Sequence, residues 1–233
     1  MKILSYNLKS LQLSLLSIMA ILLIACGGGV EGKKAKTKEA EAVKPAEIAT
    51  ETYALTRNSK IEWVGSKKFV GDKHNGTVPV KSGIFEVAED GIVGGNFILD
   101  MSNITNSDLE GEWQGKLLGH LKSPDFFDTA KFPTAEFTIT NVEKLSGVSG
   151  ATHKIKGNLT LKNTTKSIEF NADVKTAGDG ITATTPQFVI DRTQWGVEYG
   201  STDKTSVADD LKDKIISNDI GIKMSLTGGR VVR

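Results

Sequence analysis

The amino-acid sequence predicts an all-β fold, an antiparallel barrel of about eight strands with one or two short helices. Apolar and polar residues alternate along many short segments after residue 52, and this period of two is typical of sheets with one face away from water. Turn residues such as Asp90-Gly91 and Asn163-Thr164 separate these segments. Closure of the strands into a barrel removes the exposed sheet edges.

The alternation assigns one apolar face to each expected strand. Segments with this pattern span residues 96–101, 135–141, 154–162, 167–174, 185–191 and 220–226. A helical spacing interrupts them at residues 107–127, where Leu109, Trp113, Leu117 and Leu121 recur at intervals of three to four positions. A second short helix is expected around residues 206–214. The folded domain is expected to cover residues 52–233.

The N-terminus has the features of a bacterial lipoprotein signal. Lys2 and Lys9 accompany an apolar stretch, residues 11–24, which is short for a membrane-spanning helix. The stretch ends in Leu-Ile-Ala-Cys at residues 23–26, which resembles the lipobox in which the cysteine receives diacylglycerol before cleavage. We therefore expect residues 1–25 to be a signal peptide and Cys26 to be lipidated. The alternative is a buried helix with an incidental cysteine.

From this signal we expect the protein to lie in the cell envelope, on the periplasmic side of a membrane. Gly27 is not the aspartate that favours the inner membrane in some bacteria, so the outer membrane is favoured. The whole chain has a formal net charge of +1 and Cys26 is its sole cysteine. A near-neutral chain without a long basic run is a poor nucleic-acid binder, and an acylated Cys26 leaves no thiol for a disulfide.

Residues 26–51 are expected to form a flexible tether between the lipid and the barrel. They are rich in lysine, glutamate and alanine and contain no aromatic residue. Such a segment buries too little apolar surface to fold alone. About 25 flexible residues would span roughly 25–30 Å on average, which keeps the barrel close to the membrane without burying it there.

Three motifs in the second half of the chain resemble the YceI-like family. They read HLKSPDFFDTAKFPTAEF at residues 120–137, GNLTLKNTTK at residues 157–166 and IDRTQWGV at residues 190–197. Matches in order from about residue 61 to residue 226 cover nearly the whole expected domain. Two departures are modest: Asn163 stands where a glycine is usual, and Phe132 where a tyrosine is usual.

The resemblance implies a lipocalin-like barrel with an apolar channel that holds a polyisoprenoid, such as the tail of an isoprenoid quinone. The expected ligand is therefore a lipid, with no other cofactor. Channel-lining residues are predicted among the inward positions: Trp63, Phe85, Phe97, Phe137, Leu159, Phe170, Phe188 and Met224. His120 and Arg192 are candidates for polar contacts at the channel mouth.

Several alternatives stay open at the level of the sequence. The inward residues could fill a solid core, as they do in many eight-stranded barrels. The chain could be a structural or stress-protective envelope protein that acts through protein partners, or an enzyme on a lipid head group that uses His120. No catalytic residues are predicted, because the chain has no Gly-x-Ser-x-Gly motif, no phosphate loop and no recognisable nucleophile–base pair. No metal ligands are predicted, because the three histidines lack ligand spacing. A homodimer is compatible with the sequence.

Overall fold

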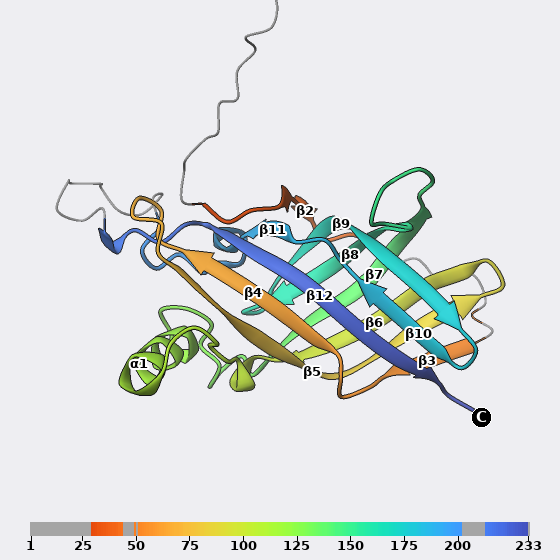
Figure 1. Ribbon diagram of the computed structural model, residues 1–233, viewed down its shortest axis with the longest axis horizontal. Coiled ribbons are helices and arrows are strands. Elements are labelled where there is room, and N and C mark those ends of the chain that lie inside the picture. Colours follow the sequence, from red (N-terminus) through yellow and green to blue (C-terminus); the bar gives the residue numbers. More distant parts are fainter. Residues whose placement is uncertain (1–28, 44–48, 50, 202–212, 233) are drawn as a thin grey trace, which may run out of the picture.

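The computed structural model describes residues 29–43, 49, 51–201 and 213–232, and it is dominated by one large sheet (Figure 1). The strands are β1 (Lys33–Lys34), β2 (Lys36–Glu39), β3 (Glu51–Leu55), β4 (Lys60–Ser66), β5 (Lys73–Ala88), β6 (Gly91–Asp100), β7 (Thr134–Lys144), β8 (His153–Leu161), β9 (Thr164–Ala177), β10 (Gly180–Thr184), β11 (Phe188–Asp191) and β12 (Asp219–Arg230). One α-helix, α1 (Gly111–Lys122), and two short 3-10 turns, η1 (Met101–Asn103) and η2 (Arg192–Trp195), complete the described elements.

The sheet closes on itself through the last strand. Strands β5 to β10 form a continuous antiparallel meander in chain order. One edge of the ring is completed by β12, which pairs with β10 and β11 and also with β3 and β4. The pairs β4–β5 and β3–β5 join the other side. The predicted all-β antiparallel barrel is therefore confirmed.

The register of the strands stacks apolar side chains on the inner face. Phe97 of β6 lies opposite Phe137 of β7, which in turn lies opposite Leu159 of β8. Because alternate residues of a strand point to opposite faces, these pairs bring the inward positions of neighbouring strands side by side. Gly157 leaves space for the Phe137 ring, since a Cβ at residue 157 would lie 2.4 Å from Phe137 Cζ.

The helix α1 covers one end of the barrel (Figure 1) and falls inside the segment where helical turns are expected. Leu121 is buried against the core, whereas Trp113 is 67% exposed. Residues 206–212 of the second expected helix lie outside the described residues. Among the described residues, no helix is long and apolar enough to span a membrane.

The N-terminal strands β1 and β2 differ from the expected tether. Residues 33–39, called the strap from here on, lie against the barrel: β1 pairs in parallel with β11, and β2 pairs antiparallel with β9. The sequence KKAKTKE alternates lysines with the smaller Ala35 and Thr37, and Ala35 is buried at 7% exposure. Backbone pairing, rather than apolar content, holds this segment. The prediction of a solvated tether is therefore wrong for these residues.

Candidate functional site

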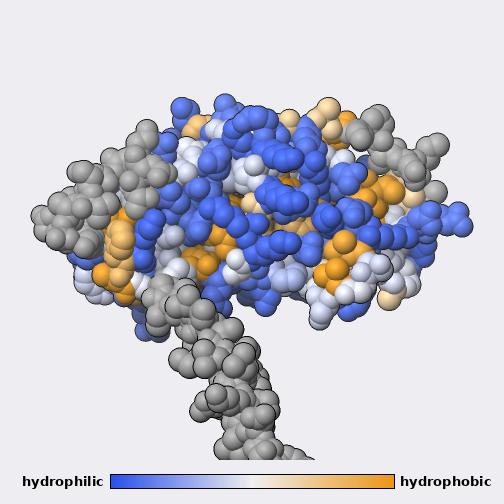
Figure 2. All heavy atoms as spheres, turned by 90° about the horizontal axis from the view of Figure 1, so that it is seen from above, coloured by the Kyte–Doolittle hydropathy of each residue, from blue (hydrophilic) through white to orange (hydrophobic). Residues whose placement is uncertain are grey.

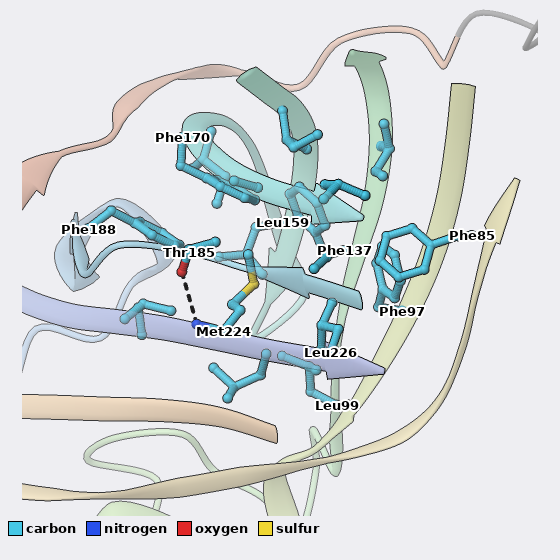
Figure 3. Close-up of a pocket in the computed structure, with 18 of the residues that line it drawn as sticks. Phe85, Phe97, Leu99, Phe137, Leu159, Phe170, Thr185, Phe188, Met224 and Leu226 are labelled. Atoms are coloured by element: carbon cyan, nitrogen blue, oxygen red, sulfur yellow. Dashed lines mark hydrogen bonds between the residues drawn. The ribbon is translucent and has the colours of Figure 1, made fainter. Parts of the chain in front are cut away.

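An apolar cavity of about 110 Å³ lies inside the barrel (Figure 3). Its described wall is built from Thr185, which follows β10, and from inward residues of nine strands: Ile61, Phe85, Ile92, Phe97, Leu99, Phe137, Ile139, Ile155, Leu159, Ile168, Phe170, Ala172, Val174, Ala183, Phe188, Ile190, Ile222, Met224 and Leu226. Among the residues that the structure describes, Thr185 is the one polar residue of the wall and no charged side chain belongs to the lining. The Thr185 hydroxyl accepts a hydrogen bond from the backbone N–H of Met224 at 2.9 Å.

Five phenylalanine rings, called the phenyl row here, run through this cavity. Each ring contacts the next, with centroid separations of 4.9 Å, 6.3 Å, 5.6 Å and 4.6 Å along the order Phe85, Phe97, Phe137, Phe170 and Phe188. The last pair is stacked with an interplanar angle of 4°. Figure 3 shows Phe85 and Phe97 at one end of the row and Phe170 and Phe188 at the other. The row therefore gives the cavity an elongated, hydrocarbon-like wall.

The cavity is narrow in comparison with the molecule that the family resemblance implies. An engineered protein cavity of about 150 Å³ holds one benzene molecule, so a cavity of 110 Å³ accommodates a group of roughly one isoprene unit. Pockets for larger ligands have volumes of about 300–1,000 Å³. A long apolar chain therefore requires the phenyl rings and their aliphatic neighbours to move apart.

Seven of the eight residues predicted to line a channel do line this cavity: Phe85, Phe97, Phe137, Leu159, Phe170, Phe188 and Met224. Trp63 does not belong to its wall, although Ile61 on the same strand does. The indole N–H of Trp63 donates a hydrogen bond to the carbonyl of Thr105 at 3.1 Å. An indole N–H needs an acceptor, which a hydrocarbon wall does not offer, so the ring turns to the loop that follows η1.

The structure also adds aliphatic wall residues that the prediction did not name. Ile92, Ile139, Ile155 and Ile168 share the inward faces of their strands with the predicted aromatic residues. The same period-two pattern that placed the phenylalanines inward could have found them. The prediction selected mainly large aromatic side chains, whereas the wall is a mixture of both types.

His120 and Arg192, predicted as mouth contacts, lie outside the cavity lining. The His120 ring meets Phe126 and Tyr199 edge to face, at 5.0 Å and 4.5 Å between centroids, and its Nε2 lies 3.3 Å from a carboxylate oxygen of Asp125. Arg192 is buried at 2% exposure, and its guanidinium donates to three backbone carbonyls, at Ser217, Val197 and Ile216. This geometry fixes the loops around η2 in place.

Two titratable groups with shifted pKa values, His153 and Asp108, lie outside the cavity lining. Burial lowers the pKa of His153 at the start of β8, and the nearby Lys144 lowers it further. Burial acts to raise the pKa of Asp108, but hydrogen bonds from the backbone of Asn75 and the side chains of His74 and Asn106 outweigh it and hold the pKa below its usual value. Among the described residues, no three histidine, cysteine or acidic side chains gather as metal ligands.

Comparison with known proteins supports the resemblance seen in the motifs. Residues 53–227 match the model of the YceI-like domain. A UPF0312 protein of Photorhabdus laumondii is 41% identical over 59 residues, and the protein YceI of Salmonella arizonae is 43% identical over 60 residues. These matches cover 25% and 26% of this chain, and 29% of the length of each relative.

Solved structures share the fold at low sequence identity. A polyisoprenoid binding domain from Saccharophagus degradans superposes with a TM-score of 0.53 at 15% identity, over 77% of this chain and 98% of that one. BcnA of Burkholderia cenocepacia superposes with a TM-score of 0.50 at 20% identity, over 72% of this chain and 95% of that one. Because the domain model matches most of the sequence, the chain belongs to the YceI-like family.

Proposed function

We propose that this protein binds a polyisoprenoid, or the isoprenoid tail of a quinone-like lipid, inside its barrel. The observation that carries the proposal is the cavity wall, in which the sole hydroxyl among the described lining residues, that of Thr185, already accepts a backbone hydrogen bond. A prenyl tail has no hydrogen-bonding group, so a wall without free polar groups matches its chemistry. The function is to store, shield or carry the lipid, with no bond made or broken.

The energetics favour a long apolar ligand over a small one. Each buried methylene-sized group contributes about 0.8 kcal/mol, so a tail of several isoprene units offsets the cost of ordering one flexible chain. Displacement of packed phenyl rings costs part of this gain. The Saccharophagus domain with the same fold is described as polyisoprenoid binding, and this supports the same ligand class here.

The second part of the proposal is a lipid anchor on Cys26 that holds the barrel at the periplasmic face of a membrane, with the outer membrane favoured. Residues 1–28 lie outside the described residues, so this part rests on the lipobox-like sequence alone. Cells grown with radiolabelled palmitate test it. The protein is expected to carry label and to sediment with membranes, and the Cys26→Ser variant is expected to lose both; a labelled variant would contradict the anchor.

Lipid binding is tested by native mass spectrometry of protein extracted gently from the envelope. The expected result is a non-covalent adduct with the mass of an isoprenoid lipid, which disappears on denaturation, whereas the acyl groups on Cys26 remain. Replacement of Phe170 with aspartate is expected to remove the adduct, because the ring lies inside the phenyl row. Protein without any extractable lipid, prepared from several hosts, would refute the proposal.

A further inference from the structure

The strap occupies an interval between two strands of the barrel. One edge of β9 pairs with β8, and its other edge pairs with β10 at residues 173–177 and with the strap at residues 166–169. β11 pairs with β12 along one edge at residues 188–191 and with the strap along the other at residues 188–189. In Figure 1 the strap lies along β9 and β11 at the top of the barrel. The barrel wall is therefore completed at this place by the N-terminal segment.

Backbone pairing and exposed ion pairs hold the strap, with little apolar contact. The face of the molecule seen from above, where the strap lies, is mostly hydrophilic with scattered apolar patches (Figure 2). Lys36 Nζ lies 3.2 Å from a carboxylate oxygen of Glu169, and Lys166 Nζ lies 2.6 Å from one of Glu39. The side chains of Lys36 and Glu39 are 70% and 87% exposed. Ala35 is the one strap residue buried in the core, and it contributes a single methyl group. Local opening is easiest where few apolar contacts are lost, so the strap can separate while the rest of the barrel stays folded.

Two chambers meet beneath the strap. The apolar cavity ends at the stacked rings of Phe170 and Phe188, and both rings also line a second pocket of about 280 Å³. The second pocket, called the polar pocket here, has a mixed wall: besides the two rings and the apolar Ala35 and Pro186, it is lined by the charged and amide side chains of Lys33, Lys34, Lys36, Lys154, Glu169, Asn171 and Gln187. Its ammonium and amide groups can donate hydrogen bonds to ligand oxygens. A hydrocarbon chamber and a polar chamber thus share one aromatic wall.

We propose that the strap is a gate: its separation from β9 opens a lateral portal through which the isoprenoid lipid enters the cavity past Phe170 and Phe188, with the head group held in the polar pocket. This inference rests on the proposed function. It requires a head group with hydrogen-bond-accepting oxygens, such as quinone carbonyls or a phosphate.

The position of the expected anchor agrees with such a portal. Glu31 contacts the barrel, since its carbonyl accepts a hydrogen bond from the side chain of Gln187, and Gly29, two residues before it, lies three residues after Cys26. Three extended residues span at most about 11 Å. An acylated Cys26 therefore places the membrane beside the start of the strap, rather than at the end of a tether of 25 residues. Lipid leaving the membrane then meets the portal side of the barrel first.

A disulfide across the gate tests the proposal. Lys36 and Glu169 are directly paired positions of β2 and β9, so Lys36→Cys with Glu169→Cys satisfies the Cα spacing of a disulfide. The control is Lys175→Cys with Thr182→Cys, a paired position of β9 and β10 outside the gate. The full-length, acylated chain is mixed with phosphatidylcholine vesicles that carry a radiolabelled long-chain isoprenoid quinone or an isoprenyl phosphate, and uptake of label is followed.

The oxidised gate pair is expected to take up lipid at least roughly tenfold more slowly than the control pair, because the covalent link suppresses local opening. Reduction restores the rate in the same protein, which shows that the variant is folded. Whichever of the two probes, the quinone or the isoprenyl phosphate, is taken up faster identifies the kind of head-group oxygen that the pocket binds. Equal rates for the oxidised gate pair and the control pair would overturn the gate. Absence of uptake by the unmodified chain would instead refute the proposed function.

A second variant opens the gate without a crosslink. Gly32 has a φ of +132°, and a Cβ there would lie 2.8 Å from the backbone oxygen of Gln187 next to the strap. Gly32→Ala is therefore expected to loosen the strap and speed lipid uptake several-fold. Gly178→Ala is the matched control, because Gly178 also has a positive φ, +56°, but no atom within 4 Å of the added Cβ. An uptake rate for Gly32→Ala equal to that of the control would contradict the gate.

Discussion

Truncation of one ring of the phenyl row should create a stability defect that the lipid repairs. Phe137 is 8% exposed and stands between Phe97 and Phe170, with centroids 6.3 Å and 5.6 Å away. Phe137→Ala removes a buried phenyl group, which typically costs about 3–5 kcal/mol of unfolding free energy. For a domain of this size the loss corresponds to a Tm decrease of roughly 6–20 °C.

The bound ligand refills the space in the variant. Each methylene-sized group of the lipid that enters the vacated volume recovers about 0.8 kcal/mol of stability. The free-energy difference between Phe137→Ala and the unmodified protein should therefore shrink by a few kcal/mol when both are loaded with lipid. Urea unfolding gives the four free energies that are compared: those of the unmodified protein and of Phe137→Ala, each delipidated and each loaded with lipid.

Phe126→Ala is the matched control for this cycle. Phe126 is 6% exposed, but its ring packs against His120 and Tyr199 and does not belong to the cavity lining. The same truncation should therefore cost a similar free energy that lipid does not restore. An equal deficit for Phe137→Ala with and without lipid would refute the reasoning, since it would show that the ligand does not reach the centre of the phenyl row.

Three further substitutions probe the frame around the cavity. Gly157→Ala should lower the free energy of unfolding by about 1–3 kcal/mol, because the added Cβ would overlap the Phe137 ring and the Thr138 carbonyl. The control is Gly115→Ala on α1, where the added Cβ meets open space, and it should change the free energy of unfolding by no more than about 1 kcal/mol. Thermal melts compare the two variants. Arg192→Lys should cost on the order of 2 kcal/mol in urea unfolding, since an ammonium cannot reach three carbonyls as the planar guanidinium does; an unchanged midpoint would contradict the anchoring role. Asp108→Asn should destabilise the protein near pH 7, because the folded state holds the pKa of Asp108 below its ordinary value of 3.8. A carboxyl with a lowered pKa stabilises the fold at pH values above that ordinary pKa, and this contribution is lost as the pH falls through the folded-state pKa. Thermal melts of the two proteins should therefore differ at pH 7 and converge near pH 2.

The barrel interior could be predicted from the sequence because its signal is local and repeated. Phe137 and Phe170 each lie in a segment with strict alternation of apolar and polar residues, and a strand with one buried face leaves only one register for such residues. The helix between β6 and β7 was predictable for a similar reason, since the spacing of Leu117 and Leu121 follows the helical period.

The features that escaped prediction depend on partners far away in the chain. Trp63 follows the inward alternation of β4, but its indole finds a hydrogen-bond acceptor at Thr105, which no local pattern indicates. The strap is poor in apolar residues, so its composition is typical of a tether, and its pairing follows from the free edges of β9 and β11. The alternation of lysines with Ala35 and Thr37 was the one local signal of a strand there.

The central claim is that an isoprenoid tail lies along the phenyl row inside the barrel. Nuclear Overhauser contacts between the methyl protons of a bound isoprenoid quinone and the ring protons of phenylalanine in isotope-labelled protein test it most directly. We expect contacts to Phe137 and Phe170 and none to Phe69, which is 47% exposed on the connection between β4 and β5. Contacts to Phe69 without any to Phe137 or Phe170 would contradict it, because the lipid would then lie on the outside of the barrel.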